Sequence, residues 1–319
     1  MSRQKKEHPI EASVKKEASL HNIGKVLVAL SGGADSVATA FTLKKTGLVV
    51  IALHCNFHLR GEESDRDMKF VEEFCNTNAI PLKIIEFDVN EYLRTHKGES
   101  LEMACRNLRH QWFEEELKRS GFDRIATGHN ADDNIETLFL NMLRGSGTRG
   151  LKGMVADNGK IWRPLLSFSR IDILTYLKSK NLCYVTDSTN LQSDYRRNFL
   201  RNEIIPQLRH VWKGFDKAMQ HTISNLNAEN NVVEFCLEQI LSCNPSSLTA
   251  AQIIAFPAPL LLIKRFIEPL GPFVTTHEEV MDAIKANKPH IRRWRLKNGE
   301  LILRNRRLFI EMGHCESRT

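Results

Sequence analysis

KVLVALSGGADS, residues 25–36, is the stretch that decides the fold class predicted for this chain of 319 residues. Its first half is a run of β-branched and apolar residues, which is typical of a buried strand. Gly32 and Gly33 then remove side chains so that backbone N–H groups can approach an anion, and Ser36 adds a hydroxyl donor. A helical pattern follows, whose N-terminal dipole favours negative charge. The stretch predicts a phosphate-binding loop between a strand and a helix; the alternative is an ordinary glycine turn capped by Ser31.

Asp35 is the charged residue of this loop, which lacks the Walker phosphate-loop pattern. A carboxylate cannot contact a phosphate directly, because both are negative. A cation between them resolves the conflict, so Asp35 is expected to hold Mg²⁺.

Strand and helix patterns alternate from this loop to about residue 187. The β-branched runs predict strands at 25–30, 49–54, 82–87 and 123–128. The amphipathic runs predict helices at 37–45, 62–78, 101–119 and 132–143. This alternation predicts an α/β fold with a doubly wound parallel sheet, whose ligands bind beyond the carboxyl ends of the strands.

An acidic motif follows the last of these predicted strands. Asp132, Asp133 and Glu136 fall in the first turns of a helix, where their spacing puts Glu136 beside both aspartates. Three acids repel one another, so Mg²⁺ or an ammonium group is expected to offset them. The alternative is a solvated acidic turn favoured by the helix dipole. His129 can contact a nucleotide, assist proton transfer or serve a structural role.

Arginine pairs occur on two predicted helix faces. Arg106 and Arg109 are three residues apart, and Arg197 and Arg201 are four residues apart. A guanidinium can bind a phosphate through two parallel hydrogen bonds. The alternative for each pair is a surface salt-bridge face.

The bulk composition indicates a cytoplasmic protein with an anionic partner. The formal net charge is +7 and the pI about 9.0, which favours nucleic acid without proving it. Seven cysteines occur without a CxxC spacing, which argues against a disulfide framework or a metal cluster. No stretch approaches the length of a membrane span, and residues 1–22 are expected to be a polar lead-in.

The alternation stops after Arg209, so a domain boundary is expected near His210. This gives a catalytic domain at 23–210 and a smaller, mostly helical domain at 211–319. Helices are predicted at 216–241, 250–254, 260–268 and 277–286, and two short strands surround residues 304–306.

The stretch Lys285–Arg307 is strongly basic. Nine lysines and arginines, among them Arg292, Arg293 and Arg295, face the single acid Glu300. Trp294 lies among them, and basic residues around an aromatic ring suit an RNA backbone and a splayed base. The alternative is a basic surface hairpin with no partner.

SGGADS after a strand resembles the loop of the pyrophosphate-loop ATPases, which cleave ATP between the α- and β-phosphates and pass AMP to a substrate oxygen. Further segments resemble one branch of them, the tRNA(Ile)-lysidine synthetases: HCNFHLRGEESDRD at 54–67, ACRNLRHQWF at 104–113 and TGHNADDNIETLFLNMLRGSGTRGLKGM at 127–154. Supporting pieces are WRPLL at 162–166, DSTN at 187–190 and YRRNFLRNEIIPQL at 195–208. The resemblance covers about the first two-thirds of the chain.

The resemblance implies a reaction in two steps. ATP adenylates the 2-carbonyl oxygen of the wobble cytidine in an isoleucine tRNA with a CAU anticodon. The ε-amine of free lysine then displaces AMP and forms lysidine, which pairs with A and changes the amino-acid specificity from methionine to isoleucine. The chain resembles a short form of the family, and a homodimer is compatible with this.

Residue chemistry and resemblance together give the expected site. Nucleotide contacts are expected from Ser31, Gly32, Gly33, Ala34, Asp35, Ser36, His54 and Arg106. Substrate contacts are expected from Arg109, Arg197, Asn198, Arg201, Arg292, Arg293 and Arg295. The catalytic residues are expected to be Asp35, His129, Asp132, Asp133 and Glu136, with Mg²⁺ on Asp35 and Asp132. Glu136 is the first candidate for lysine, and the division of the acids between lysine and magnesium stays open.

Two other functions are compatible with parts of the pattern. A tRNA cytidine 2-thiolase shares the loop class but needs cysteine pairs, and a tRNA-binding protein with an inactive loop needs no intact acidic motif. Cys105 and His110 depart from the family pattern, and we interpret Cys105 as a packing residue.

Overall fold

The computed structural model describes residues 7–186, 195–271, 277–286, 288 and 291–313. The chain divides into two compact units, Met1–Asn227 and Ala228–Thr319. The division falls inside the helix α11 (Phe215–Cys243), further along the chain than the boundary expected near His210.

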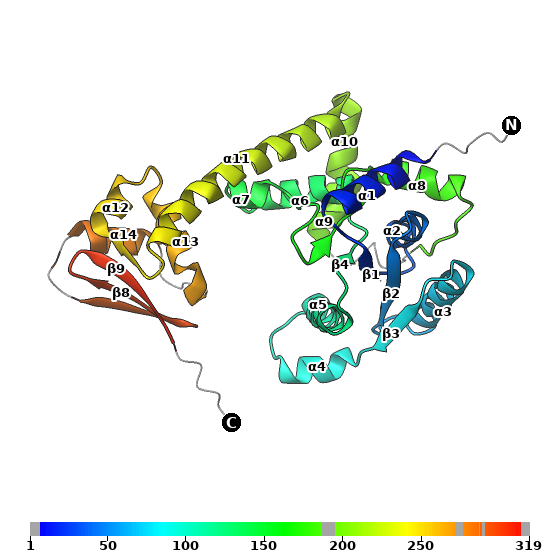
Figure 1. Ribbon diagram of the computed structural model, residues 1–319, viewed down its shortest axis with the longest axis horizontal. Coiled ribbons are helices and arrows are strands. Elements are labelled where there is room, and N and C mark those ends of the chain that lie inside the picture. Colours follow the sequence, from blue (N-terminus) through cyan, green and yellow to red (C-terminus); the bar gives the residue numbers. More distant parts are fainter. Residues whose placement is uncertain (1–6, 187–194, 272–276, 287, 289–290, 314–319) are drawn as a thin grey trace. The chain divides into compact units, whose positions relative to one another are not determined.

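The first unit is built on a parallel five-stranded sheet (Figure 1). Its strands lie in the order β3-β2-β1-β4-β5, with bounds Leu82–Glu86, Val49–Asn56, Lys25–Ala29, Arg124–Ala126 and Ile161–Trp162. This confirms the predicted doubly wound sheet. The strand β5 was not predicted, because two residues carry no periodicity.

Helices cover both faces of this sheet. Val26 and Val28 of β1 face a core shared with α1, α2 and α8, whereas Leu27 faces a second core with Phe113 of α5. The helices have the bounds α1 Pro9–Leu20, α2 Ala34–Lys45, α3 Glu62–Thr77, α4 Val89–Thr95, α5 Leu101–Ser120, α6 Ala131–Leu143, α7 Thr148–Leu151, α8 Arg170–Ser179, α9 Tyr195–Phe199 and α10 Ile205–Val211. The predicted helices therefore form, with ends displaced by at most a few residues.

The helix α1 occupies most of the segment expected to be a lead-in. Its residues Ile10, Val14 and Ala18 recur every four positions and are buried in the main core. A capping box of His8 and Glu11 begins the helix. The segment is thus an integral helix of the first unit.

The sheet order reverses at β1, which has β2 on one side and β4 on the other. Successive strands of this type leave a crevice at their carboxyl ends where the order reverses. The SGGADS loop follows β1, and the acidic motif follows β4, so the fold brings the two predicted motifs to the same edge.

The second unit combines helices with an antiparallel sheet. The predicted helices form as α12 Ala250–Ala255, α13 Pro259–Ile267 and α14 His277–Ala286. The predicted hairpin forms as β8 Gly299–Arg304 and β9 Arg307–Met312. Two unpredicted strands, β6 Ser247–Thr249 and β7 Arg292–Leu296, complete a sheet in the order β6-β9-β8-β7. The mostly helical description holds, and the structure adds a four-stranded sheet that shares one core with the helices.

Within the parts of the chain that are described, no helix is long and apolar enough to cross a membrane.

Candidate functional site

The SGGADS loop connects β1 to α2 as a closed hydrogen-bonded turn. Gly32 has φ +88°, a left-handed conformation that favours glycine, and Gly33 is the N-cap of α2. The buried Ser36 hydroxyl donates to the Gly33 carbonyl at 2.9 Å and accepts from the Ser31 backbone N–H at 3.2 Å. The N-cap has no side chain that could occupy the free N–H groups of the first helical turn, so these groups stay available to an anion.

Gly128 holds the end of β4 directly against this loop. A Cβ atom at Gly128 would come within 2.8 Å of the Asp35 carbonyl carbon and 2.9 Å of the Ser36 nitrogen. Only glycine allows the two backbones to approach this closely. Gly128 was not among the predicted site residues, although it stands in the quoted TGHN motif.

Asp35 lies in the first turn of α2 and joins both motifs. Its carboxylate accepts hydrogen bonds from Asn130 Nδ2 at 3.2 Å and from Arg170 Nη1. Burial raises the pKa of Asp35, while the Arg170 guanidinium opposes this effect. Arg170, at the start of α8, is a site residue that sequence reasoning missed.

Glu136 and Asp133 of α6 are bound by the predicted arginine pair. Glu136 is 1% exposed and accepts from Arg197 Nε at 2.7 Å and from Arg201 Nε at 2.6 Å. Both guanidinium groups also contact Asp133, at 3.1 and 3.0 Å. A π-helical turn, Leu200–Ile204, carries Arg201 toward the acids.

Asp132 is bound by two further groups. Its carboxylate accepts from the Arg170 backbone N–H at 2.8 Å and from Arg209 Nη2. Arg209 also pairs with Asp216, at 2.8 Å. Asp35, Asp132, Asp133 and Glu136, here called the acidic cluster, therefore each have an arginine partner. The cations expected from the sequence are supplied in this structure by Arg170, Arg197, Arg201 and Arg209.

Two histidines of the predicted site are held neutral by burial. His54 is 5% exposed, and its Nδ1 lies 2.8 Å from the Leu30 carbonyl oxygen, one residue before the loop. Burial lowers the pKa of His54. His129 Nδ1 lies 2.8 Å from Thr127 Oγ1, and burial lowers its pKa as well, against the opposing charge of Asp133. The contact of His54 with Leu30 thus supports the loop at its start. His129 lies just after β4, near the carboxylate of Asp133.

The predicted arginines of α5 lie in a different environment. Arg106 and Arg109 are exposed, and Arg109 stacks 5.4 Å from the centre of the Phe57 ring. Neither forms an ion pair with a residue that the structure describes. Arg163, which follows β5, also forms no ion pair with a described residue. We call Arg106, Arg109 and Arg163 the basic edge.

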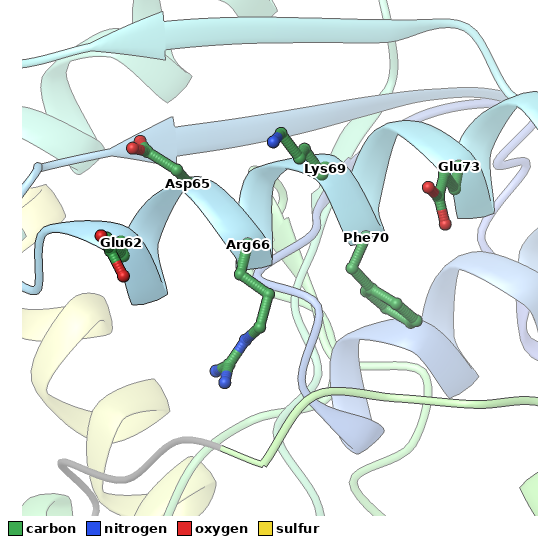
Figure 2. A pocket seen from close by; sticks show the side chains of 6 residues that line it. All are labelled: Glu62, Asp65, Arg66, Lys69, Phe70 and Glu73. Atoms are coloured by element: carbon green, nitrogen blue, oxygen red, sulfur yellow. The ribbon is translucent and has the colours of Figure 1, made fainter.

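A groove of about 530 Å³ lies along α3. Figure 2 shows Arg66 and Phe70 on the same side of this helix. Phe70 also lies beside the loop, because its ring would be 3.4 Å from a Cβ at Gly32. None of the predicted site residues is among the side chains that line this groove.

The remaining predicted contacts are distributed over both units. Asn198 has a buried Nδ2 without a hydrogen-bond partner among the described residues. In the second unit, Arg293 and Arg295 each pair with Glu300 at 3.2 Å but stay 60% and 90% exposed. The DSTN segment lies outside the described residues.

A sequence model of the PP-loop domain matches residues 5–208. The chain belongs to the PP-loop family. The PP-loop match contains β1 to β5, the SGGADS loop, the acidic cluster and the basic edge. A solved U34-tRNA thiolase from Methanococcus maripaludis shares the fold, with a TM-score of 0.58 and 20% identity over 69% of this chain and 78% of that one.

Two curated relatives of this PP-loop protein carry the name tRNA(Ile)-lysidine synthase. The protein from Parabacteroides distasonis is 40% identical over 83% of this chain and 61% of its own length. The one from Bacillus subtilis is 30% identical over 78% of this chain and 56% of its own length. The chain thus spans a little over half the length of these relatives.

Proposed function

We propose that this chain is a tRNA(Ile)-lysidine synthetase, which joins lysine to the wobble cytidine of an isoleucine tRNA at the expense of ATP. The observation that carries the proposal is the contact of Gly128 with the first turn of α2, which joins the phosphate loop to the acidic cluster. This contact places an ATP-binding element beside groups that can hold a second substrate. The names of the relatives support tRNA(Ile) as the substrate and lysidine as the product. The proposal places the enzyme in the cytoplasm with its tRNA.

The loop would hold the phosphates of ATP. The free N–H groups at the N-terminus of α2 face an anion favourably, and the Ser31 and Ser36 hydroxyls lie within the same turn. His54 supports the loop through the Leu30 carbonyl. ATP supplies an electrophilic phosphorus to the cytidine oxygen, and the protein contributes by holding the two in line.

Mg²⁺ fits the oxygen ligands at Asp35 and Asp132. This metal is commonly held by one or two carboxylates together with substrate phosphates, so no larger acidic cage is needed. Arg170 contacts both residues, through its guanidinium and its backbone N–H. We expect the guanidinium to move away from Asp35 when the metal arrives.

The acidic cluster would bind the lysine ammonium group and take up its proton. The ε-amine has a reference pKa of about 10.4, so it must lose a proton before it attacks. Glu136 is already bound by two arginines, so an ammonium group at this carboxylate must replace Arg197 or Arg201. Asp133 and Asp132 are more exposed and are reached more easily.

The exposed arginines of β7 would contact the RNA backbone. Arg292, Arg293 and Arg295 lie on the outer strand of the second sheet. Phosphate contacts of this kind give affinity that falls with salt. A homodimer is compatible with the proposal.

Sulfur transfer to cytidine is the competing function. It requires a reactive thiolate, whereas burial raises the pKa of Cys55 to about 12 and raises that of Cys105 as well. These two cysteines are therefore poor sulfur carriers.

AMP formation separates the candidates. We expect AMP and pyrophosphate from ATP when the CAU-anticodon tRNA is present, and complete turnover only when lysine is added. ATP consumption that needs a sulfur donor would support the thiolase. RNA binding without AMP would leave only a binding protein.

A further inference from the structure

Arg163 is a partly buried cation at the same sheet edge as the candidate site. It directly follows Trp162 of β5, which pairs with Ala126 of β4, so Arg163 lies level with Thr127 on the neighbouring strand. Its backbone N–H donates to the Ala156 carbonyl at 2.7 Å, which fixes the position of the residue. This hydrogen bond therefore fixes the backbone from which the Arg163 side chain extends, at the carboxyl end of β5.

Most of the hydrogen-bonding capacity of this guanidinium is unused. Nη1 donates to the Val155 carbonyl oxygen at 2.8 Å. Nε is buried without a partner, and no carboxylate forms an ion pair with Arg163 within the described ranges. A buried charge without a counter-ion is costly, and burial lowers the pKa of Arg163 accordingly.

Arg124, on the adjacent strand β4, is an arginine of the same sheet whose charge is paired. Its Nε donates to Asp157 at 2.9 Å, and this carboxylate is almost fully buried. Arg124 is also partly buried, so the two residues differ mainly in having or lacking an acid.

Other arginines act on the same two histidines as Arg163. Arg163 and Arg106 both lower the pKa of His129. Arg106, Arg109 and Arg163 all lower the pKa of His110. The basic edge thus adds positive charge near His129 and His110, where Asp133 and Glu114 oppose it.

We propose that Arg163 binds a phosphate group at the carboxyl end of β5. A planar guanidinium can bind two phosphate oxygens, and Nη2 makes no hydrogen bond to a described residue. A phosphate bound there would neutralise the charge, and a small movement of the side chain would let the buried Nε donate to a second oxygen. The proposal rests on the proposed function because the phosphate belongs to one of its substrates, ATP or the tRNA backbone. The acidic cluster, in contrast, repels phosphate.

The test compares Arg163→Met with Arg124→Met in equilibrium binding. The probes are a non-hydrolysable ATP analogue, inorganic pyrophosphate and a stem-loop RNA with a CAU anticodon. We expect Arg163→Met to raise the Kd of at least one probe about 10-fold or more, whereas Arg124→Met leaves all three unchanged. Weaker analogue and pyrophosphate binding assigns the phosphate to ATP, and weaker RNA binding with a smaller salt slope assigns it to the tRNA.

Stability provides an independent readout. Arg163→Met should unfold at the same denaturant concentration as the wild type or a higher one, because it removes an unpaired buried charge. Arg124→Met should unfold earlier, because it leaves Asp157 buried and alone. If Arg163→Met does not fold, Arg163→Lys, which keeps the charge but loses the planar fork, replaces it in the same comparison.

Unchanged Kd values for all three probes in the Arg163 variant would overturn the proposal. A wild-type protein that binds the ATP analogue but forms no lysidine would contradict the proposed function alone, since the Arg163 comparison needs only binding.

Discussion

The acidic cluster and the basic edge lie along the same edge of one sheet, yet their charges are balanced in opposite ways. Each acid of the cluster has an arginine partner, and these arginines lie on α8, α9, the π-helical turn and α10. The arginines of the basic edge have no acidic partner in the described chain. Ion pairs within the protein can order its own segments, whereas unpaired charge favours a ligand from outside. The comparison therefore supports our proposals that Arg163 binds a phosphate group and that an ammonium group replaces an arginine at the acidic cluster.

Asp35→Asn should have the largest effect on activity, because it removes the carboxylate closest to the phosphate loop. We expect AMP formation to fall by about 100-fold or more, as is typical when one electrostatic group of an active site is lost. Because burial raises the pKa of Asp35, its charge is held at a cost, and the unfolding free energy should change by no more than about 1 kcal/mol. A rapid-quench assay of AMP formation checks the expected loss of activity, and urea unfolding checks the expected change in stability. Asp282→Asn, an exposed acid of α14, is the control; equal activity of both variants would remove Asp35 from the site.

Glu136→Gln breaks the most buried ion pairs of the acidic cluster. Arg197 and Arg201 would lose a charged partner, so the unfolding free energy should fall by about 2–3 kcal/mol. Adenylated tRNA should accumulate, and turnover should need more lysine. Mass spectrometry of trapped tRNA and a lysine titration measure these effects.

Asp216→Asn is the matched control for Glu136→Gln, since Asp216 also pairs with an arginine but is 45% exposed. It should cost less than about 1 kcal/mol. If adenylation fails in Glu136→Gln while the apparent affinity for lysine is unchanged, Glu136 serves the nucleotide and our assignment of the acidic cluster is wrong.

Gly128→Ala tests whether the loop and the cluster must touch. The new methyl group would overlap the backbone of Asp35 and Ser36, so it should cost about 1–3 kcal/mol and weaken ATP binding about 10-fold. Gly147→Ala adds the same methyl where no atom lies within 4 Å, and should leave both quantities unchanged. Calorimetric ATP binding and urea unfolding compare the pair. Equal behaviour would show that the close approach has no role in the site.

His54 should give the smallest effect, visible in the pH dependence of stability. Its pKa is lower in the folded protein than the ordinary value of 6.5, so the unfolded chain binds more protons below that pH. His54→Gln should therefore be less stable than the wild type by about 1 kcal/mol at pH 7.5, for one buried hydrogen bond. The difference should shrink as the pH falls below 6.5. Parallel stability curves at pH 7.5 and 5.5 would show that His54 is not held neutral.

The first unit was predictable from sequence because short local patterns indicate most of its strands and helices. The run Lys25–Ala29 and the glycines after it predict strand, loop and helix without knowledge of the partners. The strand β5 has only two residues, and β6 has three, so their existence depends on pairing with distant strands. The helix α1 was overlooked because only three apolar residues, four positions apart, distinguish it from a polar segment.

The sequence picked out side chains that the structure brings together, but it did not reveal how they pair; their roles stay predictions. The spacing of Arg197 and Arg201 showed a common helix face, but suggested phosphate as their partner rather than Glu136. The partners of Arg170 and Arg163 depend on the strand order and on the loops between strands, which no local pattern reveals. Arg163 stands in the quoted WRPLL segment, but the short strand before it was not predicted, so no local pattern placed Arg163 at the sheet edge.

The most direct test of the account is nucleoside analysis of a CAU-anticodon tRNA treated with this protein, ATP, magnesium and isotopically labelled lysine. The account predicts a labelled lysine adduct on the wobble cytidine, formed with one AMP per adduct and absent in the Asp35→Asn variant. A wobble cytidine that stays unmodified, or that gains sulfur instead of lysine, would contradict it.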